Sequence, residues 1–195
     1  MSSIPVQRLD KRARGAVLTH FQDLTPEDRR LRFGSSLSAD GIAEYVDRVD
    51  FERDAVFAVH DDSLALVGVA HLALGDDHAE LGLSVLPAHR GRGVGGALFE
   101  RGAEHARNRF VPTLFMHCLR ENAAIVHIAQ RAGMHIVTES GDADAHLELL
   151  PASAGSIAGE LSADQVALYD YALKAQVAAW KGVNAALAQA HRDTR

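Results

Sequence analysis

The pattern of apolar positions over residues 55–150 predicts a sheet. Three apolar runs come first, joined by short acidic or glycine-containing turns, at 55–60, 64–74 and 78–86. Closely spaced runs of this kind are typical of strands that pair as an antiparallel meander. Later apolar runs predict one buried strand and two closing strands, at 113–119, 134–138 and 145–150.

Helical periods and capping residues predict the helices around these strands. Thr25 precedes a proline and two acidic residues, which is typical of a helix start, so we expect a helix over 25–33. Another helix is expected after Ser38. Two further segments with helical periodicity, the second ended by Gly133, predict helices over 94–107 and 123–132.

Composition changes near Pro151, and the chain beyond it forms an extension. Residues 151–161 are small, polar and glycine-containing, which predicts a flexible linker. Ser162 and Gln165 have the spacing of a capping box, so an amphipathic helix is expected over 162–192. Its apolar side chains form one stripe, with Val166, Tyr169, Leu173, Val177, Trp180 and Leu187. The stripe either packs back onto the domain or forms a homodimer contact.

The length and composition fit one globular domain with an extension. A chain of 195 residues is too short for two full catalytic domains. Hydrophobic residues make up 47% and charged residues 24%, as in ordinary globular proteins. Cys118 is the single cysteine, which excludes an internal disulfide and favours a reducing compartment. Because no apolar run fits a signal peptide or membrane span, we expect a cytoplasmic protein without a membrane partner.

The net charge of −6 is unevenly distributed along the chain. A basic N-terminal arm over 1–14 carries +3 and residues 152–195 are neutral, so residues 15–151 carry −9. An acidic centre repels nucleic acid, and no nucleic-acid partner is expected. It favours cationic partners such as amines, although solvated acidic faces explain the same balance. We expect the basic arm to be a frayed terminus.

The segment with the clearest chemistry is the glycine-rich loop after the third predicted strand. It contains Arg90, Gly91, Arg92, Gly93, Gly95 and Gly96, and the next helix begins inside it. Glycines let the backbone approach a ligand closely, and the first amides of a helix favour bound anions. We therefore expect a phosphate or pyrophosphate ligand.

Two common phosphate loops fit this segment poorly. A P-loop is excluded because no Lys-Ser or Lys-Thr follows the glycines. The glycines at 91, 93 and 96 match a dinucleotide fingerprint formally. That fingerprint belongs in a first strand-helix-strand unit, whereas a predicted meander precedes the loop here.

The motif Arg90-x-x-Gly93-x-Gly95 on a strand-to-helix turn resembles the pyrophosphate-binding motif of the GNAT superfamily of acyl-CoA-dependent N-acyltransferases. The resemblance covers residues 15–150, and the segment 122–134 is similar to the last conserved stretch of that family. It implies an α/β fold of the α+β layered kind. The expected sheet is mixed, mostly antiparallel, flanked by helices and splayed between the strands that end near Leu86 and Leu119.

Two further segments narrow the resemblance. Residues 24–33 with Val49 and Asp50 are similar to the catalytic domain of bacterial protein-lysine acetyltransferases, and so is Ala79-Glu80. The implied function is acetyl transfer from acetyl-CoA to a primary amine by direct attack in a ternary complex. The acceptor is either a protein lysine or a small amine.

The resemblance also implies which residues bind acetyl-CoA as the acyl donor. The pyrophosphate would be bound by the loop residues Arg90, Gly91, Arg92, Gly93, Val94, Gly95 and Gly96. The pantetheine arm would pair with the backbone of Leu83, Ser84 and Val85, and Asn122 would contact the donor beyond the splay. The amide of Val85 would stabilise the oxyanion of the tetrahedral intermediate. Asn122 could instead serve only as a helix N-cap.

Glu80 is the candidate general base. Strand alternation puts Glu80, Gly82 and Ser84 on one face and the intervening residues on the other. If the first face lines the cleft, partial burial would raise the pKa of Glu80 toward a useful range. If it does not, Glu80 faces solvent.

The chain departs from the family pattern at Ala129, where many members have a tyrosine that protonates the leaving thiolate. His127 could replace it but is better explained as a helix-surface or packed residue. This departure favours one alternative function, a catalytically weak acyl-CoA-binding module. Cys118 is expected in the strand core rather than as an acyl carrier, and no closely spaced set of metal ligands appears, so no metal is expected.

Overall fold

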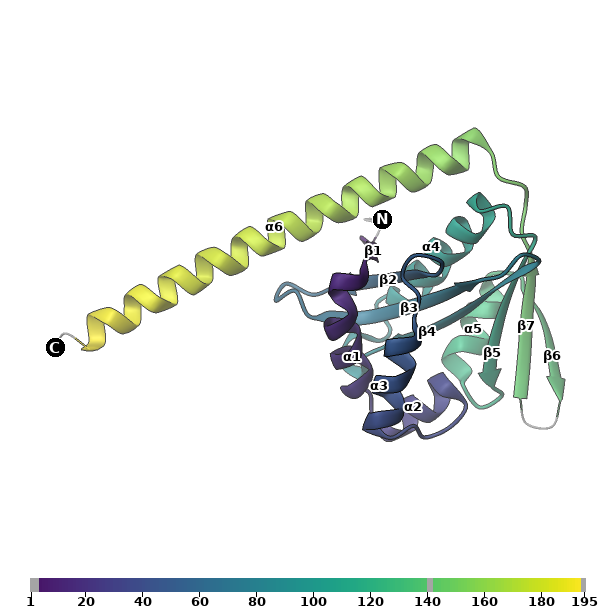
Figure 1. Ribbon diagram of the computed structural model, residues 1–195, viewed down its shortest axis with the longest axis horizontal. Coiled ribbons are helices and arrows are strands. Elements are labelled where there is room, and N and C mark those ends of the chain that lie inside the picture. Colours follow the sequence, from purple (N-terminus) through teal and green to yellow (C-terminus); the bar gives the residue numbers. More distant parts are fainter. Residues whose placement is uncertain (1–3, 140–141, 194–195) are drawn as a thin grey trace.

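The computed structural model describes residues 4–139 and 142–193, and side chains there except those at 138, 139, 142 and 185–193. Within these residues, seven strands form one sheet in the order β1-β2-β3-β4-β5-β7-β6 (Figure 1). The strands are β1 (Gln7–Leu9), β2 (Ala55–His60), β3 (Leu66–Leu74), β4 (His78–Val85), β5 (Thr113–Leu119), β6 (His135–Glu139) and β7 (Asp142–Glu148). The predicted meander is β2, β3 and β4, and its antiparallel pairing is confirmed.

Helices cover both faces of this sheet. One face carries α1 (Arg14–Gln22) and α3 (Ala39–Arg48), and the other carries α4 (Val94–Asn108) and α5 (Ala123–Arg131). The short helix α2 (Pro26–Phe33) lies at the β4 and β5 side of the first layer (Figure 1). The long α6 (Ala154–Asp193) packs on α4 and β1 and then extends beyond the domain (Figure 1).

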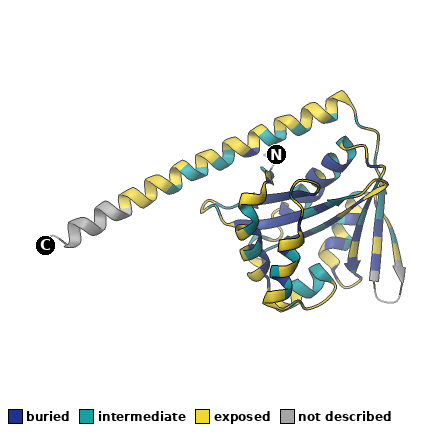
Figure 2. Ribbon diagram, viewed as in Figure 1, coloured by how far each residue is buried: buried dark blue, intermediate teal, exposed yellow. Residues whose placement is uncertain are grey.

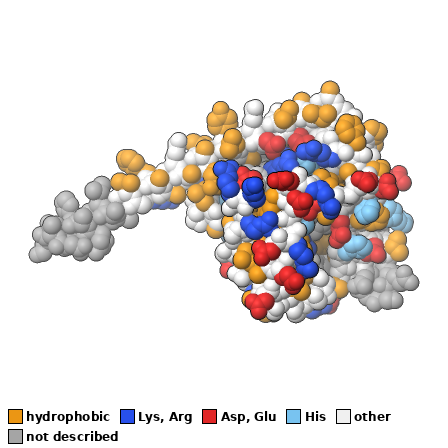
Figure 3. Space-filling view, viewed as in Figure 1, with side chains coloured by type: hydrophobic (Ala, Val, Ile, Leu, Met, Phe, Trp, Pro, Cys, Tyr) orange, Lys and Arg blue, Asp and Glu red, His pale blue; other side chains and the backbone are white. Residues whose placement is uncertain are grey.

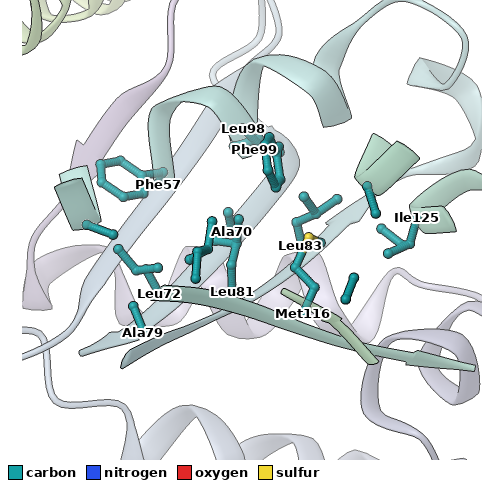
Figure 4. Close-up of a cluster of buried hydrophobic side chains, with 14 of the residues drawn as sticks. Phe57, Ala70, Leu72, Ala79, Leu81, Leu83, Leu98, Phe99, Met116 and Ile125 are labelled. Carbon is teal, nitrogen blue, oxygen red and sulfur yellow. The ribbon is translucent and has the colours of Figure 1, made fainter. Parts of the chain in front are cut away.

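The central strands are apolar at consecutive positions because both of their faces are buried. In β2, Val56 and Ala58 face the cluster around α1 and α3, while Phe57 faces the cluster around α4. Figure 4 shows the second cluster, where Phe57, Leu98 and Phe99 lie over the sheet. A sheet buried on both faces removes the period-2 pattern that a half-exposed strand would show. Figure 2 shows the same central burial.

β4 and β5 are the one adjacent parallel pair among the described strands, and they separate along their length. Their pairing is confined to three positions, His78 with Thr113, Ala79 with Leu114 and Glu80 with Phe115. Beyond Glu80 the two strands diverge, while each keeps its antiparallel neighbour on the other side. The expected mixed, mostly antiparallel and splayed sheet is therefore confirmed.

The prediction that the basic arm is frayed is wrong for residues 7–14. β1 pairs with the edge of β2, and a 3-10 turn, η1 (Lys11–Ala13), follows it. The guanidinium of Arg14 donates hydrogen bonds to the carbonyls of Val46 and Val49 and lies 5.0 Å from the ring centroid of Phe51. Arg14 thus fastens the arm, because its guanidinium donors match two carbonyls at the end of α3.

The predicted linker over 151–161 and the helix start at Ser162 are also wrong. The helix begins at Ala154, and the hydroxyl of Ser153 accepts a hydrogen bond from the Ser156 amide at 3.1 Å. Ser162 lies inside the helix, where its hydroxyl donates to the Ala158 carbonyl at 2.9 Å. Both Ser153 and Ser162 have sequence surroundings typical of a helix cap. The contacts that the segment between them makes with α4 decide that the helix begins after Ser153.

Several polar contacts join the first turns of α6 to α4. Arg101 of α4 is 5% exposed and bonds to Glu160 at 3.0 Å and to Asp164 at 2.5 Å. His105 and Asn108 bond to Glu160 as well, at 2.5 and 2.6 Å. Farther along, Lys174 donates to the His60 carbonyl at 2.9 Å.

The apolar stripe of α6 does not pack on the domain. Its described members are 49–73% exposed, namely Val166, Tyr169, Leu173, Val177 and Trp180. Leu187 lies outside the residues whose side chains are described. Orange side chains along α6 mark the apolar surface in Figure 3. The alternative in which the stripe packs back onto the domain is therefore wrong, because the opposite side of the helix, with Glu160, Asp164, Ala167, Tyr171 and Lys174, makes the contact.

The Glu160 cluster predicts an acid-sensitive contribution to stability. Burial alone would raise the pKa of Glu160, but hydrogen bonds from His105, Asn108 and Arg101 outweigh it and lower the pKa to about 2 from 4.5. A carboxylate with a depressed pKa stabilises the fold above pH 4.5, and this contribution is lost as the pH falls toward 2. We expect Glu160→Gln to lower the free energy of unfolding at pH 7 by about 2 kcal/mol. The loss is limited because Arg101 still pairs with Asp164 in this variant.

Urea unfolding from pH 7 down to pH 3 measures this effect. The difference between Glu160→Gln and the native chain should shrink as the pH falls below 4.5. Glu100→Gln, on the exposed side of α4, is the matched control and should be neutral. A difference independent of pH would contradict the assignment.

Candidate active site

The gap between β4 and β5 exposes one hydrogen-bonding edge of β4. The amide of Leu86 donates to the Val67 carbonyl of β3 at 2.9 Å. Backbone groups of successive strand residues point to opposite sides, so the amides of Val85 and Leu83 face the gap. Of the three residues predicted to pair with pantetheine, Leu83 and Val85 therefore direct their backbone groups into the gap. The backbone of Ser84 faces β3 instead.

The side chain of Ser84 is also engaged elsewhere. It is 8% exposed, and its hydroxyl lies 2.9 Å from Nε2 of His20, whose Nδ1 lies 2.9 Å from the Leu66 carbonyl. A carbonyl only accepts, so Nδ1 carries the proton and the Ser84 hydroxyl donates to Nε2. Burial lowers the pKa of His20 to about 4, which keeps this ring neutral. The pair anchors β4 to α1.

The glycine loop has the conformation of an anion cradle. Gly91 and Gly93 have φ values of +71° and +87°, which favour glycine, and α4 starts directly after Gly93. The amides of residues 94–96 have no acceptor within the helix, because the first helical bond runs from Ala97 to the Gly93 carbonyl. These donors and the positive end of the helix dipole suit a pyrophosphate.

Arg90 fastens the loop to α2, while Arg92 is exposed. The guanidinium of Arg90 lies 2.7 Å from Asp28 and donates to the Val85 carbonyl at 3.0 Å. Burial would raise the pKa of Asp28, but hydrogen bonds from Thr25 and Arg90 outweigh it and lower the pKa. The partner at Asp28 could not be found from sequence, since 62 positions separate the two residues.

On the other side of the gap, α2 is fastened to the end of β5. Asn122 caps α5 by accepting from the Ile125 amide at 3.3 Å, and it donates to the Leu31 carbonyl at 3.3 Å. Arg30 and Glu121 form an ion pair at 2.6 Å. α2 therefore joins both sides of the gap, and the predicted N-cap role of Asn122 is confirmed.

A cavity of about 650 Å³ adjoins the gap on the α2 and α3 side of the sheet. Glu80 and Gly82 line it, as alternation along β4 predicted, together with Arg32, Tyr45 and His71. Glu80 is exposed, so the expected partial burial is absent from the structure. Its carboxylate is nevertheless on the cavity side of the strand.

A chain of hydrogen bonds that the sequence did not reveal crosses one wall of this cavity. Nε2 of His71 lies 3.1 Å from the Asp54 carboxylate, and Nδ1 lies 2.7 Å from the Tyr45 hydroxyl. Burial lowers the pKa of His71, although Asp54 acts in the opposite direction. The neutral ring therefore donates to Asp54 and accepts from Tyr45, which accepts in turn from Arg32 at 3.1 Å.

The sequence profile of the acetyltransferase (GNAT) family matches residues 19–134, which is more than half of the chain. The chain belongs to the GNAT acetyltransferase family. Its matched part begins in α1 and ends at Met134, just after α5, so it contains the β4 edge, the glycine loop and every residue that lines the cavity except Asp144.

Solved structures show the same fold at low sequence identity. The GNAT domain of the Streptomyces lividans protein PAT is 22% identical, with a TM-score of 0.63 over 74% of this chain and 89% of that one. The yncA protein of Salmonella typhimurium, solved with acetyl-CoA, is 17% identical, with a TM-score of 0.61 over 78% and 98%. Spermidine N-acetyltransferase from Vibrio cholerae, solved with CoA and spermine, is 17% identical, with a TM-score of 0.60 over 76% and 96%. No curated protein matches the sequence.

Of three further residues discussed from sequence, Cys118 lines the cavity, whereas Ala129 and His127 do not. Ala129, at the position of the tyrosine of many GNAT enzymes, is fully buried, and His127 is exposed on α5. Cys118 is buried in β5, where its thiol donates to the Ala143 carbonyl at 3.3 Å. Across residues 4–139 and 142–193, no group of three potential metal ligands comes together, and no helix is long and apolar enough to span a bilayer.

The loop geometry predicts that Gly91→Ala weakens CoA binding. A Cβ at Gly91 meets no atom within 4 Å, so its effect comes from the positive φ, which costs about 1–2 kcal/mol and shifts the loop. Gly133 has the same φ of +71° and equally open surroundings, but it follows α5. Calorimetric titration with CoA should show a loss of about tenfold or more for Gly91→Ala and none for Gly133→Ala. Equal CoA affinities of the two variants would contradict the assignment of this loop as the anion-binding site.

Proposed function

We propose that this GNAT enzyme transfers an acetyl group from acetyl-CoA to a primary amine, by direct attack in a ternary complex. The observation that carries the proposal is the unpaired edge of β4, which runs from the exposed anion cradle to the cavity that Glu80 lines. A donor bound along this edge would bring its thioester to the cavity, where an amine can approach. The acceptor is a small amine or a protein lysine.

The donor would be bound mainly by backbone groups. The amides of residues 94–96 and the side chain of Arg92 supply positive potential for the pyrophosphate. Gly91 and Gly93 shape the loop around it, and Arg90, whose charge is offset by Asp28, holds the loop in place. The amides of Leu83 and Val85 offer the edge of a strand to the pantetheine arm, as an added strand would use it. Ser84 supports this edge by anchoring β4 to His20.

The amide of Val85 is the proposed oxyanion donor. It is fixed in a strand whose pairing with β3 holds Ser84, and Arg90 binds the carbonyl of the next peptide, so the backbone on both sides of the donor is held when charge develops on the thioester oxygen. One fixed donor of this kind contributes about 3 kcal/mol to stabilisation of the transition state. The cavity begins at Gly82, three residues earlier along β4, and would admit the amine from that side.

Glu80 is the proposed general base, directly or through one water. It lies at the last paired position of β4, where the gap begins, and lines the cavity. Its negative charge attracts the ammonium form of the acceptor and then accepts a proton from it. A thiolate leaves readily, so the alanine at position 129 does not prevent collapse of the intermediate.

Glu80→Gln should lower kcat/KM for acetyl transfer by about 100-fold while CoA affinity stays unchanged. The defect should be largest at low pH, since an amine that is already deprotonated needs no base. Thiol release measured from pH 6 to pH 10 tests this dependence. Asp77→Asn, an exposed acid in the turn before β4, is the matched control. Full activity of Glu80→Gln would remove this residue from the mechanism.

We also propose a homodimer formed through α6. The exposed stripe is long, and the helix beyond Lys174 extends past the domain, where it lacks the packing of an apolar face that gives most protein helices their stability. Residues 152–195 carry no net charge, so two copies of the helix do not repel each other. Pairing of two stripes would bury Leu173, Val177 and Trp180.

Removal of residues 175–195 tests the dimer and leaves the contacts of Arg101 and Lys174 in place. The mass in solution, measured by light scattering, should fall from dimer to monomer, and Trp180→Ser should weaken the dimer in the same direction. Lys181→Ser, at the next and also exposed position, should have no effect. A monomer before and after removal would exclude the proposal.

A further inference from the structure

Arg32, near the end of α2, points its guanidinium at the cavity without an acidic partner. Nη2 donates to the Tyr45 hydroxyl at 3.1 Å, while Nε is buried and has no hydrogen-bond partner. In the described part of the chain, no carboxylate lies within 4.0 Å of the Arg32 guanidinium. Every other arginine of α2 is paired with an acid or with backbone carbonyls. Arg32, which lies beside the cavity, is thus the arginine of α2 that has neither kind of partner.

The surroundings of Arg32 fix its position. The centre of the guanidinium lies 4.9 Å from the ring centroid of Phe33 and 5.8 Å from those of Phe21 and Tyr45. Its flat side covers Gly82, where an added Cβ would collide with the guanidinium. Aromatic faces and a glycine therefore hold a cation in place, and such rigid placement is costly for a surface arginine that has no ligand.

The charges around the cavity are otherwise negative or neutral. Among its described lining residues Arg32 is the single lysine or arginine, while Glu80 and Asp144 supply carboxylates. Asp144 is paired with His117, and His71 is neutral and bonded to Asp54 and Tyr45. One unpaired cation and one unpaired carboxylate thus remain, Arg32 and Glu80.

These two groups are spaced along the same face of β4. Arg32 covers Gly82, and Glu80 is one side-chain repeat away, about 7 Å along the strand. Both groups line the same cavity as His71, and their charges act on that ring in opposite directions. A molecule with an amine and an anion a few bonds apart fits between them.

We propose that the acceptor carries a carboxylate a few bonds from its reacting amine, as amino acids do, and that Arg32 binds this carboxylate while Glu80 faces the amine. This inference rests on the proposed acetyl transfer and narrows its acceptor. A guanidinium binds a carboxylate through charge-assisted hydrogen bonds that an amide cannot replace. A polyamine would place a second cation near Arg32 and be repelled, and a lysine side chain has no carboxylate beside its amine.

The test compares each protein amino acid, and β-alanine, with its own carboxamide as acceptor. For the amino acid that is used best, kcat/KM of the native chain should be roughly 10- to 100-fold higher with the free acid than with its carboxamide. Arg32→Gln should abolish this preference and leave CoA affinity unchanged, and Arg32→Lys should retain part of it. Arg48→Gln removes a positive charge from the exposed side of α3 and should retain all of it. Equal use of acid and amide, or a preference that survives in Arg32→Gln, would overturn the inference.

A binding measurement separates this inference from the proposed reaction. Calorimetry with the N-acetylated acids and their N-acetylated carboxamides needs no turnover, and the native chain should bind the acids more tightly by a similar factor. If this difference is present and lost in Arg32→Gln while no acetyl transfer occurs, the proposed reaction fails and the carboxylate site stands. If acetyl transfer occurs without any such difference, the reaction stands and the carboxylate site fails. The CoA affinity of each variant verifies that it is folded.

Discussion

The separation of β4 from β5 beyond Glu80 is the constraint on which the rest of the site depends. A strand in the middle of a sheet normally has both edges paired, and an unpaired edge invites aggregation or a ligand. Here the amides of Leu83 and Val85 face a gap that α2 bridges, through Arg90 on one side and Asn122 on the other. The edge is thus available to a molecule of extended shape and shielded from another strand.

Close packing of α4 on the sheet sets where the anion cradle lies relative to that edge. A Cβ at Gly68 of β3 would come within 2.7 Å of Val94, so the first turn of α4 rests almost on the strand. Leu98 and Phe99 continue this contact into the core (Figure 4). The helix N-terminus is therefore held at the end of β4, where the gap is open.

Charged side chains serve two different purposes in this fold. Arg101 and Glu160 are buried against each other and fasten α6, a contact that is specific because an unpaired partner would be costly to bury. Arg32 is fixed as firmly, by aromatic rings and by the absence of a side chain at Gly82, yet it has no acid beside it. The Arg101–Glu160 pair therefore stabilises the fold, whereas the charge of Arg32 remains available to a ligand.

The strands of the meander, the helix after the glycine loop and the face of β4 that carries Glu80 can all be predicted from the amino-acid sequence, because they follow from local periodicity and backbone preference. The motif that points to the family is also visible in the sequence, because Gly91 and Gly93 serve a local backbone shape with positive φ, whereas Gly95 makes room for the side chain of Ile128. The sequence could not determine the docked arm, the helix start at Ala154 or the pairing of Arg90 with Asp28. These features depend on long-range packing, which also brings Arg32, Gly82, Tyr45 and His71 together. Such contacts join residues far apart in the chain, so no local pattern records them.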